Sequence, residues 1–118
     1  NNSSSWSTVS DFRLKKNIID NNEGLETIAA IRVRNFEYRT AEEVTELPEH
    51  TAIKKAGVQL GVIAQELQQV CPDCVKEEST GVLSVDSDNV FWHMVNAIKQ
   101  LNAKVEALQA EITTLKGN

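Results

Sequence analysis

A serine and a lysine stand five residues apart near the start of the chain, in the segment TVSDFRLKKNI. Ser10 is a poor nucleophile near neutral pH until a base removes its hydroxyl proton, and Lys15 can be that base only as a neutral amine. Arg13 and Lys16 flank Lys15, and their positive charge favours the loss of its proton. Because this spacing is common, the same residues also fit a turn that begins at Ser10 and Asp11 and carries a solvated basic face.

Two cysteines, Cys71 and Cys74, form the motif CPDC. A single CxxC can be a redox pair, or it can be half of a zinc site that needs a second Cys or His pair. The only histidines are His50 and His93, and neither belongs to a paired ligand motif. We therefore favour a third interpretation, in which both thiols are small apolar residues at the end of a helix. No metal and no cofactor is expected.

Composition limits the remaining possibilities. The chain has 118 residues, 41% of them hydrophobic and 5% aromatic, and a formal charge of -5, as expected for one globular domain with an aliphatic core. Its lysines and arginines are scattered among acids, which argues against a nucleic-acid partner. No apolar run approaches the roughly 20 residues of a membrane-spanning helix, and the polar start lacks the apolar region of a signal peptide, so no membrane partner is expected.

The first half of the chain predicts few regular elements. Residues 1–9 are rich in Ser and Asn and are interpreted as a linker or as the end of an upstream segment. Apolar residues at helical spacing predict a short helix over 25–31, and the alternating stretch RVRNFEYRT predicts a strand after it. Residues 41–57 have no clear period, so we expect a long loop or protruding arm.

The middle of the chain predicts a strand followed by a helix and then a hairpin. VQLGVIA reads as a strand, and AQELQQV reads as a short helix that Pro72 ends. VKEESTGVLSVD then fits two strands around the turn STG. The polar residues 87–89 offer side-chain oxygens that can cap the next helix.

Four unbroken heptads mark the end of the chain, over residues 89–116. The pattern favours a coiled coil over a helix packed on its own domain, because its apolar stripe is narrow and the rest of the helix is polar. Glu111 at g and Lys116 at the following e can pair between parallel chains. By simple heptad rules, the β-branched residues at a and the leucines at d favour a coiled coil of two helices. These expected interface residues are Phe91, Met94, Ile98, Leu101, Val105, Leu108, Ile112 and Leu115.

Four motifs in order now identify a family. SDFRLKKNI, GVIAQELQQVCPDCV, VD at 85–86 and NAIKQLNAKVEAL resemble the C-terminal intramolecular chaperone domain of bacteriophage tailspikes, tail fibres and neck appendages. This is a self-cleaving domain with a serine-lysine dyad, also found in a membrane-tethered eukaryotic transcription factor. The resemblance extends from Ser10 to about Leu115, and its S-D-x-R-x-K-x-N-I pattern is specific. Asp11, Arg13 and Asn17 are the supporting motif positions.

The resemblance implies an α+β fold with a small antiparallel sheet, short helices and a long C-terminal helix that forms a parallel trimeric coiled coil. Residues 1–9 would end an upstream fibre segment, and residues 10–118 would form the auto-processing domain, with an arm at 41–57 and the coiled-coil helix at 89–116. Its partners would be two further copies of itself and the upstream fibre or spike of the same polypeptide.

The resemblance also implies a reaction. The domain would hold three upstream chains in register while they fold and would then release itself by cutting the Val9-Ser10 bond, with Ser10 as nucleophile and Lys15 as base. It would act in the host cytoplasm during virion assembly and be absent from the mature virion. A non-proteolytic trimerisation and registration module is the alternative, and a small redox domain that uses CPDC comes third.

Overall fold

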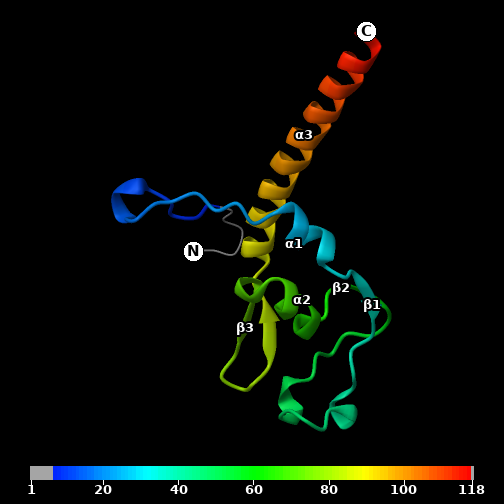
Figure 1. Ribbon diagram of the computed structural model, residues 1–118. Helices are drawn as coiled ribbons and strands as arrows, with labels where there is room; N and C mark the ends of the chain where they lie inside the picture. Colours follow the sequence, from blue (N-terminus) through cyan, green and yellow to red (C-terminus); the bar gives the residue numbers. More distant parts are fainter. Residues whose placement is uncertain (1–6, 118) are drawn as a thin grey trace.

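The computed structural model describes residues 7–117, so most of the predicted segment 1–9 lies outside the described residues. The chain is elongated, because its radius of gyration is 20.0 Å, whereas about 13.5 Å is expected for a compact domain of this length. Figure 1 shows a small α+β body, a long C-terminal helix that extends away from it, and an N-terminal segment that projects to one side. The predicted α+β class and long C-terminal helix are confirmed.

Two small antiparallel sheets replace the single sheet that was expected. Strand β1 (Arg34–Phe36) pairs with β2 (Gln59–Gly61), and β3 (Val75–Glu77) pairs with β4 (Leu83–Val85). Each strand is only 3 residues long and pairs with one partner, so neither pair extends into a larger sheet. The expected strand and hairpin pattern is right, but the assumption that these strands share one sheet is wrong.

Three α-helices lie among residues 7–117. Helix α1 (Leu25–Ala30) and helix α2 (Ala64–Val70) are short, and a 3-10 turn, η4 (Pro72–Cys74), follows α2 where the proline was expected to end it. Helix α3 (Ser87–Gly117) begins slightly before the predicted residue 89. Its cap is Asp86 rather than residues 87–89, because the Asp86 carboxylate accepts a hydrogen bond of 3.1 Å from the Asn89 backbone N–H.

Residues 41–57 are mostly irregular, as predicted, with two 3-10 turns, η2 (Ala41–Glu43) and η3 (Glu49–Thr51). They lie at the end of the body remote from the C-terminus of α3 (Figure 1). Part of this segment borders the β3–β4 hairpin, because Leu47 and Val82 line the same surface hollow.

The core is small. Leu67, Cys71 and Cys74 are its buried centre, and full burial of a leucine contributes about 2 kcal/mol. The partly buried hydrophobic residues packed against this centre are Ile31, Val62, Val70, Val75 and Val90. In contrast, every residue of α3 from position 101 to 117 is exposed, so the outer half of this helix is not buried against the rest of the described chain. No helix among the described residues has the length and apolar character needed to cross a membrane.

Helix α3 also anchors the segment that leads into α1. The Asn96 amide donates to the carbonyl oxygens of Asn21 (3.0 Å) and Glu23 (2.9 Å), and the Gln100 side chain accepts from the Leu25 N–H at 2.7 Å. Gly24 is buried at this contact, and a Cβ added there would lie 2.6 Å from the Ala97 nitrogen. The close approach of α1 to α3 therefore requires glycine.

Candidate functional site

The structure brings the predicted nucleophile and base together. The Lys15 Nζ atom donates a hydrogen bond of 2.5 Å to the Ser10 Oγ. Proton transfer between a serine hydroxyl and a lysine amine takes place within hydrogen-bond reach, directly or through one water, and this pair is within direct reach. Both residues come from one chain, and both are exposed.

A short turn produces this contact. Asp11 caps the 3-10 turn η1 (Phe12–Leu14), and its carboxylate accepts from the Arg13 backbone N–H at 2.9 Å. The Lys15 N–H then donates to the Phe12 carbonyl at 3.0 Å, so the turn reverses the chain between Ser10 and Lys15. The local sequence is sufficient to place one side chain beside the other.

The motif positions around the pair stabilise that turn. The Arg13 guanidinium binds the Asp11 carboxylate at 2.7 Å, and this hydrogen bond holds the pKa of Asp11 below its usual value. Arg13 was expected to act as a cation beside Lys15, but the structure pairs it with Asp11 instead. Asn17 has a positive φ of 54°, a left-handed conformation that asparagine tolerates better than most residues.

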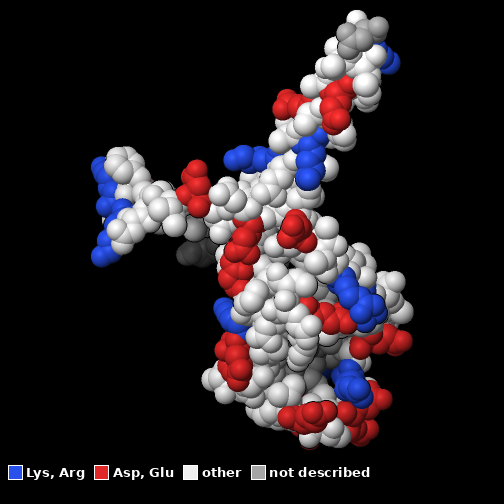
Figure 2. Space-filling model, in the orientation of Figure 1, with Lys and Arg blue, Asp and Glu red and all other residues white. Residues whose placement is uncertain are grey.

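The segment that carries the pair is exposed and partly apolar. Phe12, Leu14 and Ile19 are 75%, 76% and 88% exposed, which is unusual for large hydrophobic side chains so close together. Figure 2 shows lysine and arginine gathered at the tip of this projecting segment. An active site for peptide cleavage needs a more enclosed environment, so in a single described chain the site lacks cover.

The eight predicted interface residues lie on α3 with their side chains exposed. Their exposed fractions run from 43% at Val105 to 78% at Leu115. On another face of the same helix, His93 and Ala97 are buried against the body. Helix α3 therefore uses one face within the chain and leaves the heptad stripe unpaired.

Sequence reasoning missed three polar positions on α3 that hold the segment before α1 in place. His93, Asn96 and Gln100 recur at spacings of three and four residues, which places them on one helix face. All three bind the backbone of residues 22–23 or their neighbours. That spacing of polar residues beside the apolar stripe was the available signal.

The cysteine pair differs from the expectation of two thiols. Cys71 and Cys74 are fully buried at the end of α2, as expected, but they are joined in a disulfide. His93 lies next to them, and its pKa is raised, first by the hydrogen bond to the Glu23 carbonyl and then by the Asp73 carboxylate, against the effect of burial. The ligand atoms of Cys71, Asp73, Cys74 and His93 all lie within 4.8 Å of one another, a spacing suitable for a metal ion.

Taken together, the fold and the site define a small α+β module with a serine-lysine pair on an exposed N-terminal segment and an unpaired heptad helix. Residues 10–76 match a peptidase family described as the chaperone of endosialidase. The chain belongs to this family, as its motifs predicted.

Two curated relatives extend the similarity beyond that region. A probable tail fibre protein of Escherichia phage Phieco32 is 33% identical over 112 residues, which is 92% of this chain and 14% of the relative. Myelin regulatory factor homolog 1 of Caenorhabditis elegans is 32% identical over 114 residues, 88% of this chain and 12% of the relative. The chain thus spans about one seventh or less of these proteins. Family and phage relative together support a chaperone role.

Proposed function

We propose that this chain is the intramolecular chaperone of a longer phage tail fibre or spike, that it assembles as a parallel homotrimer, and that it releases itself by cutting the Val9-Ser10 bond. It acts in the host cytoplasm during virion assembly and is absent from the mature virion. The observation that carries the proposal is the 2.5 Å contact between Lys15 Nζ and Ser10 Oγ in a member of a peptidase family.

The heptad stripe supports self-association. Eight large apolar side chains exposed on one helix lose contact with water only if another helix covers them, and burial of such area is favourable at roughly 25 cal/mol per Å². A sustained heptad pattern of apolar residues at a and d favours packing against copies of the same helix. The number three and the parallel direction come from the resemblance to the phage chaperone domains. Three helices side by side would start three identical fibre chains in register.

The chemistry follows from the order of residues in the chain. Lys15, as the neutral amine, takes the hydroxyl proton of Ser10 while Ser10 Oγ attacks the carbonyl carbon of Val9. The protonated Lys15 then gives this proton to the Ser10 nitrogen as the C–N bond breaks, so the nitrogen leaves as an amine and Val9 is held as an ester on the serine side chain. Water hydrolyses this ester and leaves a new carboxyl group at Val9. The negative charge that develops on the Val9 carbonyl oxygen needs N–H donors.

Assembly and cleavage are coupled in this proposal. A neutral lysine and an effective set of oxyanion donors both need a partly dehydrated pocket. Within one chain Ser10 and Lys15 are exposed, and so are the apolar residues beside them. Neighbouring subunits or the folded fibre would supply the missing cover. Release after folding would leave the fibre without the segment that aligned its chains, which makes its stability kinetic.

The exposure of the pair also favours the second candidate, a registration module that trimerises and does not cut. In that case the contact between Ser10 and Lys15 would only close a turn. The two functions are separated by expressing the domain with its natural upstream fibre sequence and running the product on a denaturing gel. Self-cleavage gives two fragments with the masses expected for a cut between Val9 and Ser10. The registration module gives one band of full length.

A further inference from the structure

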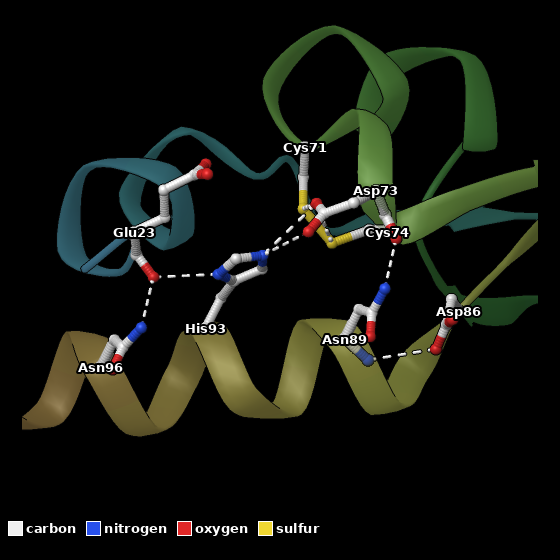
Figure 3. The surroundings of a disulfide bond; sticks show 8 residues. All are labelled: Glu23, Cys71, Asp73, Cys74, Asp86, Asn89, His93 and Asn96. Carbon is white, nitrogen blue, oxygen red and sulfur yellow. Dashed lines mark hydrogen bonds and ion pairs between the residues drawn. A yellow bond between two sulfur atoms is a disulfide. The ribbon is translucent and has the colours of Figure 1, made fainter. Parts of the chain in front are cut away.

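The disulfide lies in a cluster of metal-binding groups that the proposed cleavage does not use. Cys71 ends helix α2, Cys74 ends the turn η4, and His93 comes from the first turns of α3 (Figure 3). Asp73 stands between the two cysteines. Its Oδ1 atom lies 3.0 Å from the Cys71 Sγ, and its Oδ2 atom lies 3.2 Å from the His93 Nε2. Four potential ligands from three elements thus converge on one point.

The imidazole of His93 is oriented as a metal ligand would be. Its Nδ1 atom lies 2.9 Å from the Glu23 carbonyl oxygen, which can only accept a hydrogen bond, so Nδ1 carries a proton. In the neutral ring this leaves the lone pair on Nε2, the atom that faces Asp73 and the cysteines. Metal-binding histidines characteristically donate their other N–H to a carbonyl or a carboxylate. The ring is 5% exposed, so its orientation is fixed by packing as well.

We propose that the chain in its thiol form binds one Zn²⁺ ion through the sulfurs of Cys71 and Cys74, the Nε2 atom of His93 and the carboxylate of Asp73. Two thiolates and an imidazole select zinc over the harder cations magnesium and calcium. Four protein ligands give the closed tetrahedral shell of a structural site. The Asp73 side chain is 55% exposed and borders a surface hollow shared with His93, which gives an ion a way in.

The thiol form arises by reduction of the disulfide. A dithiol reductant transfers two electrons and two protons to the Cys71–Cys74 bond, which yields two thiols, and is itself oxidised to a disulfide. Zn²⁺ then displaces the two thiol protons and binds the thiolates. In a tetrahedral site with Zn–S bonds of about 2.3 Å the sulfurs stand about 3.8 Å apart, so rotation of the cysteine side chains accompanies binding. Reduced cysteines prevail wherever glutathione and thioredoxin act.

Zinc would link three parts of the fold. The cysteines belong to the small core, His93 belongs to α3, and the Glu23 carbonyl that orients His93 belongs to the N-terminal segment. Because such a site forms only in the folded chain, its binding free energy adds to the free energy of unfolding. Either the disulfide or the zinc ion can therefore join Cys71 to Cys74, and zinc would add a ligand bond to His93 of α3 to the hydrogen bond that already joins Asp73 and His93. This inference does not depend on self-cleavage.

The test is a metal titration of the reduced 118-residue chain without oxygen. Zn²⁺ is added against a coloured chelator, and Co²⁺ is added in parallel as a spectroscopic probe. We expect one equivalent of either metal, a thiolate-to-cobalt charge-transfer band, and protection of both thiols from alkylation by one equivalent of Zn²⁺. Cys74→Ser should abolish tight binding. His93→Gln should weaken it at least about tenfold, since even supporting residues of metal sites contribute 10–100-fold.

The matched control is His50→Gln, which changes the other histidine at an exposed position of η3 and should leave the affinity for Zn²⁺ unchanged. X-ray absorption of the zinc-loaded wild-type chain identifies the ligand atoms directly and does not depend on whether a variant folds. It should show two sulfur neighbours at about 2.3 Å and nitrogen or oxygen neighbours at about 2.0–2.2 Å. Binding of less than one equivalent, equal affinity in His93→Gln, or a zinc shell without two sulfurs would overturn the proposal.

Discussion

The Nζ atom of Lys15 lies 2.5 Å from the Oγ atom of Ser10 in the same chain, across a single 3-10 turn. Because the turn is held by local hydrogen bonds of Asp11, the proposed nucleophile and base do not need to come from different subunits. Other subunits are needed in our account only to cover the pair. This relationship makes a prediction about mixed trimers.

In a trimer that mixes Ser10→Ala chains with Lys15→Ala chains, no single chain holds both the hydroxyl and the amine. If each pair acts within its own chain, co-expression of the two variants with their upstream fibre sequence should give no cleavage. Two tags of different mass would show by mass spectrometry that mixed trimers had formed. Cleaved product from the mixture would show instead that the base can act across subunits.

The heptad stripe predicts a change of oligomeric state on charge insertion. Leu101→Asp with Leu108→Asp places carboxylates in the centre of the proposed interface, where they would be buried without partners. The double variant should sediment as a monomer, whereas the wild-type chain should sediment as a trimer. Ala103→Asp with Ala110→Asp adds the same charges at exposed f positions of the same heptads and should leave the trimer intact. A trimer that survives the leucine changes would refute the coiled-coil interface.

Gly24 predicts a large effect for one added methyl group. In Gly24→Ala the new Cβ would lie 2.6 Å from the backbone nitrogen of Ala97, so α1 must move away from α3. Overpacking of this kind costs about 1–3 kcal/mol in the free energy of unfolding. Gly117→Ala, with no atom within 4 Å of the added Cβ, is the control and should change little. Urea unfolding followed by circular dichroism measures both, and equal midpoints would mean that the contact is not tight.

The ion pair of Arg34 and Glu66 predicts a pH dependence. Their shortest contact is 2.7 Å, and the hydrogen bond from Arg34 lowers the pKa of Glu66 from 4.5. A carboxyl group whose pKa is lower in the folded chain than in the unfolded chain stabilises the fold at any pH above the unfolded pKa. This stabilisation is lost as the pH falls below 4.5 and through the folded pKa. Because the two side chains are 39% and 29% exposed, screening by water keeps the contribution small.

Glu66→Gln should therefore be less stable than wild type at pH 7, and the difference should shrink as the pH falls below 4.5. Urea midpoints measured for both proteins across this range give the comparison. Glu106→Gln, at an exposed position in the outer half of α3, should follow wild type throughout. If the loss of stability in Glu66→Gln grew larger as the pH fell, the ion pair would not be its cause.

Local patterns predicted the parts of the fold that local residues determine. AQELQQV forms the expected helix, VKEESTGVLSVD forms the expected hairpin, and the heptads coincide with α3. The separate sheets were missed because strand pairing depends on which three-residue segments meet, and alternation does not encode that. Asp86 was missed as the cap because several adjacent polar residues compete for the role.

The candidate site divides in the same way. The common spacing of Ser10 and Lys15 left their role open, and the family resemblance singled them out as a pair. The structure shows the contact between them, and catalysis stays a prediction. His93 was set aside as unpaired because its partners are distant in sequence: Glu23 is 70 residues away and Asp73 is 20. Only the packing of α3 against the N-terminal segment and η4 reveals that environment.

The most direct test of the central claim is mass spectrometry of trimers whose chains extend upstream by their natural fibre sequence, in wild-type, Ser10→Ala and Lys15→Ala forms, with Lys16→Ala as control. We expect wild type and Lys16→Ala to give a fragment that begins at Ser10. Ser10→Ala should stay full length, and Lys15→Ala should be slowed by about 10²–10⁴-fold, the usual contribution of a general base. A wild-type trimer that stays full length, or a Ser10→Ala trimer that is cut at Val9-Ser10, would contradict the account.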